Sequence, residues 1–349
     1  MSFDPNAPAA RDSGLFGLPY TPAEAKLWIL PVPWEATTSY GGGTSKGPAA
    51  ILEASKQVDL YDLDVDRPYL PGIVMLEAPT EIAIWNEEGK ACAKAIIDNG
   101  GDAGDDPELL AALARVNELS VKVNHAVYEA SAKVLAEGKI LGLVGGDHSV
   151  PLGAIKALAK AGPTFGVLHV DAHSDTRDAY EGFAYSHASI MRNVLEEVPE
   201  VEKLVQIGIR DMCEEEAFYC EAKGERVRTF TDRAVQRRKL RGEAFARIAD
   251  DVVAALPSRV WISFDVDGLD PRYCPHTGTP VPGGLDLAEV VYLMAEVVRS
   301  GRTIVGFDLN EVAPGPDGDE WDANVGARLL YKLAGFTFAS QGLAKLCEG

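Results

Sequence analysis

The sequence predicts an α/β protein with three layers, in which helices cover both faces of a mostly parallel central sheet. Short apolar runs alternate along the chain with segments of helical periodicity, as they do in βαβ units. Most of these runs are continuous and do not alternate with polar residues, which is typical of strands buried on both faces. We expect strands at residues 27–31, 140–144, 165–170, 204–209, 260–264 and 304–309.

Helices are expected between these strands. In residues 118–137, Leu119, Val123 and Val127 recur at helical spacing, and Gly138 is a typical helix stop. Two acidic, Gly-containing stretches, residues 98–107 and 314–322, are expected to be exposed loops. Further helices are expected at residues 152–160, 187–197, 239–256 and 287–300.

The chain of 349 residues shows no internal repeat and no long linker, so we expect a single domain over residues 1–349. Residues 1–25 are polar and rich in Pro and Gly, and we expect them to form an N-terminal extension. They lack the basic start and apolar run of a signal peptide. The five cysteines form no CxxC pair, which favours reduced thiols. The expected location is therefore the cytoplasm.

The composition excludes some classes of partner. Asp and Glu number 53 against 33 Lys and Arg, so the formal net charge is −20 at pH 7. Nucleic acids and anionic membranes attract basic surfaces, so neither is expected as a partner. No stretch of 18 uninterrupted apolar residues is present, which argues against a membrane-spanning helix.

The chemistry-bearing residues follow three of the expected strands, at the edge of the sheet where open parallel sheets bind ligands. Residues 140–144 run into GGDHS (145–149), 165–170 into DAHSD (171–175), and 260–264 into DVDGLDP (265–271). Side chains two positions apart in an extended segment project to one face. We therefore expect these acids and imidazoles to converge from three neighbouring strands. The candidate ligands are His148, Asp171, His173, Asp175, Asp265 and Asp267.

Four carboxylates buried together repel one another and require cations, and two divalent ions would neutralise them. Oxygen-rich ligands with some imidazole and no thiolate favour Mn²⁺, with Fe²⁺, Co²⁺ or Ni²⁺ as alternatives, and disfavour structural zinc. Any single Asp or His of the set, taken alone, is better explained as a helix cap or a core residue. The combined spacing favours a metal pair.

At these three blocks the sequence resembles the ureohydrolase (arginase–agmatinase) family, from about Trp28 to the C-terminus. The resemblance implies a single three-layer α/β/α domain, assembled into homotrimers or homohexamers. It also implies a binuclear manganese site whose bridging water attacks a guanidinium carbon, with release of urea and an amine. The resemblance assigns His148 and Asp175 to one ion, His173 and Asp267 to the other, and Asp171 and Asp265 to both.

The resemblance also implies roles for residues outside the ligand set. His187, in the segment YSHAS, matches the histidine that moves a proton to the leaving amine, for which an imidazole is suited by its pKa. Glu311 matches the carboxylate that binds the guanidinium group, and a carboxylate can accept two of its N–H bonds in a fork. Asp175 would also orient the attacking hydroxide, and Thr279 matches a supporting position more weakly.

The substrate's tail is less well defined by the sequence. Residues 176–185 lack the Asn that arginases use to hold an amino-acid end. Arg177 favours a substrate carboxylate, whereas Asp178 and Glu181 favour a second positive charge. His276 stands where relatives have a small residue, so it is expected to narrow the pocket or contact the substrate.

An agmatinase-like hydrolase of a small cationic guanidino substrate is therefore the expected function. The alternatives are an arginase, a hydrolase of guanidino acids or guanidine, and a formimidoylglutamase-type amidine hydrolase. Outside enzymes, the alternative is a non-catalytic partner subunit, and a dinucleotide-binding dehydrogenase is disfavoured because no early strand is followed by GxGxxG. Residues 77–116 exceed the length found in compact relatives and are expected to be an insertion that covers the site or contacts a neighbouring subunit.

Overall fold

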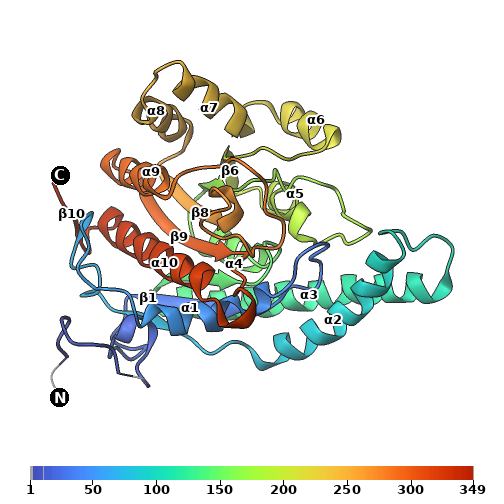
Figure 1. Cartoon of the computed structure of the whole chain (residues 1–349), viewed down its shortest axis with the longest axis horizontal. Coiled ribbons are helices and arrows are strands. Elements are labelled where there is room, and N and C mark those ends of the chain that lie inside the picture. The colour runs from blue at the N-terminus through green and yellow to red at the C-terminus, as the bar shows by residue number, and fades with distance from the viewer. Residues whose placement is uncertain (1–2, 11, 349) are drawn as a thin grey trace.

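The computed structural model describes residues 3–10 and 12–348 of the chain. In this part of the chain, the central sheet has eight strands in the order β3-β1-β4-β9-β8-β5-β6-β7, and all neighbouring pairs are parallel (Figure 1). The strands are β1 (Leu27–Val32), β3 (Ile73–Met75), β4 (Ile140–Gly145), β5 (Phe165–Val170), β6 (Val201–Ile207), β7 (Val227–Phe230), β8 (Arg259–Asp265) and β9 (Thr303–Asn310). A separate antiparallel pair joins β2 (Val65–Asp66) to β10 (Lys345–Leu346).

Two helical layers cover this sheet, each with its own apolar core. One core joins the sheet to α1 (Gly47–Ser55), α8 (Phe245–Ala255), α9 (Leu287–Arg299) and α10 (Trp321–Ser340). The other core joins the opposite face to α3 (Pro107–Ala136), α4 (Leu152–Ala161) and α5 (Ile190–Glu197). The expected three-layer α/β fold is confirmed.

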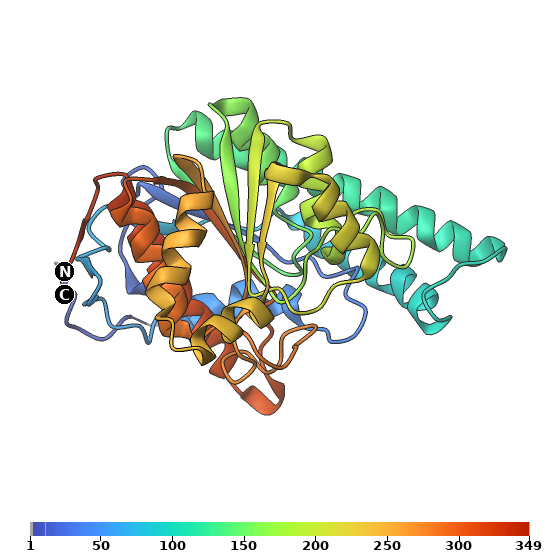
Figure 2. The same ribbon diagram turned by 90° about the horizontal axis from the view of Figure 1, so that it is seen from above.

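The stretch expected as an insertion, residues 77–116, forms α2 (Thr80–Asp98) and the first turns of α3. The two helices pack against each other, and we call them the α2–α3 hairpin. The hairpin extends past the end of the sheet, and the connection at residues 99–106 lies at its tip (Figure 2). The α3 helix starts earlier than the sequence predicted because Asp106 caps it: its carboxylate accepts hydrogen bonds from the backbone N–H groups of Glu108 and Leu109.

One expected helix is interrupted. Residues 239–256 were expected to form one continuous helix, but α7 (Asp232–Leu240) ends just inside this stretch and α8 starts at Phe245. Gly242 lies between the two with φ of 85°, a left-handed conformation that ends a helix. The remaining helix, α6 (Glu214–Ala222), follows β6.

The described part of the N-terminal extension packs onto the domain. Phe16 is buried, its ring lies 4.9 Å from that of Tyr331 in α10, and its backbone N–H donates to Ser55 Oγ in α1. Residues 1, 2 and 11 of the extension lie outside the described residues. Among the helices of the described chain, none combines the length and the apolar character needed to cross a membrane.

Candidate metal centre and substrate cavity

The candidate residues lie at the carboxyl ends of four adjacent central strands, in the order β4-β9-β8-β5. The three strands predicted from the sequence to be neighbours are not all adjacent, since β9 lies between β4 and β8, so this part of the prediction is wrong. The inserted strand contributes to the site, because Glu311 directly follows it. The floor of the site is therefore one continuous edge at the middle of the sheet.

The side chains converge through tight turns rather than through extended segments. Asp171 Oδ1 accepts the backbone N–H of His173 at 2.5 Å, and Asp265 Oδ1 accepts that of Asp267 at 2.8 Å within a 3₁₀ turn (Val266–Gly268). Asp267 Oδ1 in turn accepts the N–H of Ala172 at 2.9 Å, which links the loop after β8 to the loop after β5. These backbone hydrogen bonds engage only one oxygen of each carboxylate, and the second oxygen faces the imidazoles of the cluster.

The imidazole of His148 faces three of these carboxylates. Its Nδ1 lies 3.0 Å from Asp171 Oδ2, 3.3 Å from Asp265 Oδ2 and 3.4 Å from Asp175 Oδ2. On the far side of the ring, Nε2 lies 2.9 Å from Ser263 Oγ, whose hydroxyl donates to Asp308 Oδ1 at 2.8 Å. A hydrogen bond from Nε2–H to Ser263 would leave the Nδ1 lone pair available to a cation held among these carboxylates, as in metal-ligating histidines with a second hydrogen-bond partner.

A second group of ligand atoms forms around His173. Its Nδ1 lies 3.0 Å from Asp267 Oδ2 and 3.5 Å from Asp171 Oδ1. Asp171 therefore belongs to two sets of atoms, each set lying within 4.8 Å, one with His148 and Asp175 and the other with His173 and Asp267. This arrangement suits two cations that share a carboxylate.

The electrostatics of the cluster also fit cations. His148 and the four aspartates are at most 4% exposed. Burial raises the pKa of Asp265, and the negative charges of Asp267 and Asp171 raise it further. Burial and Asp171 likewise raise the pKa of Asp175. The carboxylates of the cluster repel one another, so they require positive charge nearby. Because the available donors are carboxylate oxygens and imidazole nitrogens, the residues fit a pair of divalent cations.

A further histidine, not predicted from the sequence, supports the cluster. His169, in β5, is fully buried, and its Nε2 lies 2.8 Å from Asp171 Oδ2. Gln206 Nε2 approaches its Nδ1 at 3.1 Å, so the proton belongs on Nε2, which donates to Asp171. Burial lowers the pKa of His169, in keeping with a neutral ring. A polar residue inside the apolar run FGVLHV was the available signal.

Glu311 has one engaged oxygen and one without a partner. Its Oε1 accepts the backbone N–H of His148 at 2.9 Å, and its Oε2 is buried with no hydrogen-bond partner among the described residues. Burial raises its pKa, and the negative charges of Asp265 and Asp147 raise it further. A Cβ atom on Gly278 would lie only 3.1 Å from Oε2, so glycine at this position leaves room beside the free oxygen. A cationic group beside Oε2 would relieve both the missing hydrogen bond and the charge repulsion.

His187 stands at the start of a 3₁₀ turn (His187–Ser189) directly before α5. Thr37 Oγ1 lies 3.5 Å from its Nδ1 and accepts its backbone N–H at 3.2 Å. Burial lowers the pKa of His187 to about 4, and a positive charge on His173 contributes to this. The imidazole is therefore neutral at pH 7.

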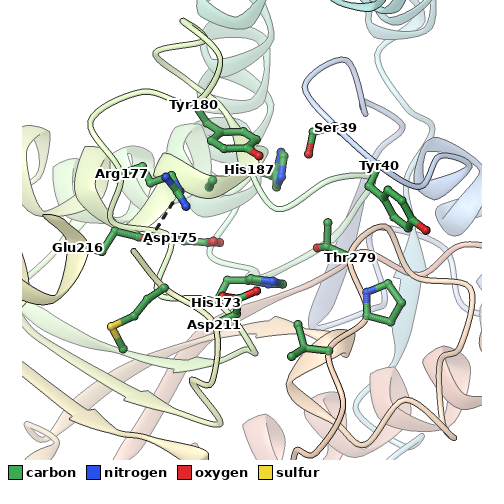
Figure 3. A pocket seen from close by; sticks show the side chains of 14 residues that line it. Ser39, Tyr40, His173, Asp175, Arg177, Tyr180, His187, Asp211, Glu216 and Thr279 are labelled. Atoms are coloured by element: carbon green, nitrogen blue, oxygen red, sulfur yellow. Dashed lines mark ion pairs between the residues drawn. The ribbon is translucent and has the colours of Figure 1, made fainter. Parts of the chain in front are cut away.

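A cavity of about 270 Å³ opens above the cluster, which is a volume suited to a small molecule. His173 lies at its floor, Arg177, Tyr180 and His187 line one side, and Tyr40 and Thr279 line the other (Figure 3). The complete lining is Ser39, Tyr40, His173, Asp175, Arg177, Tyr180, His187, Ala188, Asp211, Met212, Glu216, Thr279, Pro280 and Val281.

Two predicted substrate contacts, Arg177 and Thr279, thus lie at this cavity, whereas the third, His276, does not. The Nδ1 of His276 lies 2.9 Å from Asp322 Oδ2, and its backbone N–H donates to Asp322 Oδ1. Asp322 is fully buried at the start of α10. His276 is therefore a residue that fastens the 274–280 loop to α10 rather than part of the cavity wall.

A buried acid–imidazole cluster at the strand ends of a parallel α/β sheet, beneath a small cavity, defines a metal-binding hydrolase site. Comparison with known proteins agrees: the arginase family profile matches residues 25–335, and the chain belongs to the arginase family. It is 32% identical to an N(1)-aminopropylagmatine ureohydrolase of Synechocystis sp., over 91% of each chain. It is 29% identical to an agmatinase of Bacillus subtilis, over 89% of this chain and 91% of the relative.

Solved structures show the same fold. Proclavaminate amidino hydrolase from Streptomyces clavuligerus superposes with a TM-score of 0.71 at 24% identity, covering 96% of this chain and 99% of the other. Agmatine ureohydrolase of Thermoplasma volcanium gives a TM-score of 0.69 at 24% identity, covering 95% and 96%. The resemblance inferred from the three sequence blocks is confirmed at the level of the family.

Proposed function

We propose that this protein is a binuclear manganese hydrolase that cleaves the guanidino group of a small cationic substrate, agmatine-like, into urea and an amine. The observation that carries the proposal is the unpartnered Oε2 of Glu311 at the edge of the acid–imidazole cluster. A substrate guanidinium would supply the missing hydrogen-bond donor and would be held next to the ligand set. The names of the relatives, an aminopropylagmatine ureohydrolase and an agmatinase, support the same chemistry.

The six ligands proposed from sequence would hold the ions, with His148 and Asp175 on one, His173 and Asp267 on the other, and both sharing Asp171 and Asp265. When bound, a pair of divalent cations would lower the pKa of a water molecule and so supply a nucleophile at neutral pH. Mn²⁺ suits the oxygen-rich donor set best, and Ni²⁺, Co²⁺ and Fe²⁺ remain alternatives. His169 and Ser263, as the outer partners of Asp171 and His148, would keep these two ligands oriented.

Glu311 would bind the substrate by accepting guanidinium N–H bonds at Oε2, while its Oε1 stays fixed by the His148 N–H. Such a charge-assisted bond is strong where water is excluded, and it would hold the planar group in one orientation. Thr279, which lines the cavity and follows Gly278 beside Glu311 Oε2, would support the bound group. Asp175, as a carboxylate facing the cavity, would orient the attacking oxygen by accepting its proton in a hydrogen bond.

His187 would deliver the proton that the departing amine needs. Its pKa of about 4 makes the ring neutral at pH 7, so it can take up a proton during the reaction and release it readily. The ring lies at the cavity wall, within reach of a substrate bound over the cluster (Figure 3).

The tail of the substrate would extend between Tyr40 on one wall and the Arg177–Tyr180 pair on the other. Agmatine is our first expectation, and arginine, guanidino acids, guanidine and formimidoylglutamate are the alternatives. We further propose a cytoplasmic homotrimer or homohexamer with no nucleic-acid or membrane partner.

A substrate panel tests the proposal. Purified protein loaded separately with Mn²⁺ and Ni²⁺ is incubated with agmatine, arginine, 4-guanidinobutyrate, guanidine and formimidoylglutamate, and urea, ammonia and formamide are measured. Release of urea from agmatine is the expected result. If metal binds but no compound turns over, the proposal fails, and activity that returns only on mixing with a paralogous chain would instead favour the partner-subunit alternative.

A further inference from the structure

One wall of the substrate cavity is a loop, residues 176–186, which we call the tail-wall loop. It contributes Arg177 and Tyr180 to the lining and ends next to His187. Its middle forms a two-residue turn: Tyr180 and Phe183 exchange both backbone hydrogen bonds, at 3.2 and 2.9 Å. Glu181 and Gly182 between them have φ of 54° and 81°, the left-handed pair of a type I′ turn. The tip of such a short turn must be held in place if Tyr180 is to keep a fixed orientation.

The tip is held by the α2–α3 hairpin through a single amide. Asn117 of α3 donates from Nδ2 to the carbonyl of Gly182 at 3.1 Å and accepts the N–H of Ala184 at Oδ1, at 2.9 Å. One side chain therefore satisfies two backbone groups on either side of Phe183. No shorter or charged side chain reproduces both bonds, because the position needs a donor and an acceptor in a fixed fork.

Apolar packing adds to this clamp. Phe183 is fully buried in a small separate core that consists of Ala93 and Ile96 of α2 and Val116 of α3. A Cβ atom on Gly182 would lie 2.9 Å from the side chain of Leu113, so the turn sits directly on α3. The turn of the tail-wall loop is thus seated on the hairpin, and Asn193 of α5 adds one hydrogen bond to the carbonyl of Ala184 at 3.0 Å.

The same hairpin also holds the opposite wall. Lys90 of α2 forms an ion pair with Glu35 Oε1, and Asn86 Oδ1 accepts the backbone N–H of Glu35 at 2.8 Å. Glu35 is buried, and its Oε2 accepts the N–H groups of Gly43 and Ser45 at 2.6 and 2.9 Å. These bonds order the Gly-rich segment that follows Tyr40 in the chain.

The position of Tyr180 matters to the site because two functional candidates pack on its ring. The guanidinium carbon of Arg177 lies 4.9 Å from the ring centroid, and the ring of His187 lies 6.0 Å from it at an interplanar angle of 79°. A shift of the turn would move Tyr180 and Arg177 together, while the metal ligands, which sit on the sheet, would stay in place.

We infer that Asn117 is a positioning residue for substrate specificity, through which the α2–α3 hairpin sets the wall that contacts the substrate's tail. The inference rests on the proposed function for the identity of the substrate, and it deepens that proposal by naming which part of the fold selects the tail. It also gives the hairpin a role within its own subunit.

Binding measurements on the manganese-loaded protein test this inference without requiring turnover. Agmatine serves as the ligand with a tail and methylguanidine as the ligand without one. Both Kd values are measured by calorimetry in a His187→Ala background, in which turnover is expected to be slow, and kcat and KM are measured with His187 present. Asn117→Ala removes both hydrogen bonds, and we expect Kd and KM for agmatine to rise about ten-fold while kcat and the Kd of methylguanidine change less than about three-fold.

Two further variants complete the test. Asn117→Asp retains the acceptor for the Ala184 N–H and loses the donor, so an intermediate rise in the Kd for agmatine is expected. This variant replaces Asn117→Ala if the latter does not fold. Arg115→Ala is the matched control: Arg115 pairs with Glu88 and Glu118 on the same hairpin and does not line the cavity.

Equal weakening of both ligands by Asn117→Ala, or an effect no larger than that of Arg115→Ala, would overturn the inference. A wild-type protein that releases no urea would refute the proposed function instead, and the two Kd values would still decide the role of Asn117.

Discussion

The floor and the tail wall of the cavity are built in different ways. The floor stands on the carboxyl ends of β4, β9, β8 and β5, and its carboxylates are fixed by backbone N–H groups of their own loop or of the neighbouring loop. The tail wall is seated on the α2–α3 hairpin through Asn117 and a separate small core. The floor therefore shares the rigidity of the sheet, whereas the wall depends on an element that extends beyond it (Figure 2).

This difference suggests that the floor carries out the reaction and the tail wall selects the substrate. A reaction common to a family requires an unvarying arrangement of charges, and the sheet provides it. Selection among substrates with different tails requires a surface that can change without disturbing those charges, as loops on a rigid scaffold allow. Mutations in the floor should therefore abolish the reaction, while mutations in the wall should redistribute it among substrates.

The largest effect is expected from a ligand at the floor. Replacing Asp267 with Ala removes both the carboxylate opposite His173 and the acceptor of the Ala172 N–H. We expect kcat to fall by about 10⁴-fold, as befits loss of metal-assisted activation of water. Metal analysis of the dialysed protein should give fewer than two ions per chain.

Asp270→Asn provides the control for this substitution. Asp270 lies in the same segment but caps the N–H of Arg272 at 3.0 Å, outside the cluster. It should keep two ions and near-normal activity. Full metal content in the Asp267→Ala protein would contradict the proposed ligand set.

A smaller loss of activity is expected on substitution of His187, which lies on the cavity wall but would take part in the proton transfer. His187→Ala should lower kcat by about 10³-fold because the leaving amine loses its proton donor, within the range for general acid catalysis. KM and metal content should change little. The matched control is His125→Ala, a histidine of α3 away from this cavity. A kcat that falls no further than in the control would remove His187 from the mechanism.

Much of the floor could be predicted from sequence because its parts are local. GGDHS, DAHSD and the DVD block each follow an apolar run, and parallel strands end at the same edge of a sheet. The turns that aim the carboxylates, such as Asp265 onto the Asp267 N–H, were not foreseen, and neither was β9 as the strand between β4 and β8. Strand order is set by packing of distant segments, which short motifs do not encode.

The tail wall was harder to predict for the same reason. The bonds of Asn117 to Gly182 and Ala184 join residues more than 60 positions apart, and nothing near Asn117 in the sequence marks it. His276 illustrates the converse, since a conspicuous residue close to a motif turned out to pair with the buried Asp322. The spacing of a motif predicts which residues lie together at the end of a strand. It does not predict which distant helix will contact them.

Glu311 tests the link between floor and substrate. Glu311→Gln keeps an oxygen for the His148 N–H but loses the negative charge beside the substrate. We expect kcat/KM to fall by about 10²-fold, close to the value of one charge-assisted hydrogen bond in a buried site. Glu214→Gln, in the exposed first turn of α6, is the control. Tighter binding of guanidines by Glu311→Gln would contradict the assignment.

The smallest effect is expected from Arg177, and it concerns preference rather than rate. The guanidinium lies over the ring of Tyr180, with its Nε 3.7 Å from the buried Glu216 carboxylate. Glu216 is itself anchored by the N–H groups of Thr176 and Cys213, both at 2.9 Å, so it holds Arg177 in place (Figure 3). A positive charge fixed there repels an ammonium tail and attracts a carboxylate tail.

Arg177→Met removes that charge while keeping apolar contact with the ring. The kcat/KM ratio for agmatine over 4-guanidinobutyrate should therefore rise by about ten-fold, equivalent to ~1.4 kcal/mol between charges in a partly solvated site. Arg192→Met is the control, because Arg192 lies beside the same loop but pairs with Asp178 and stacks on Tyr219. A ratio unchanged in Arg177→Met would mean that the substrate's tail does not reach this arginine, and selection would then rest with Tyr40 and Tyr180 on the two walls.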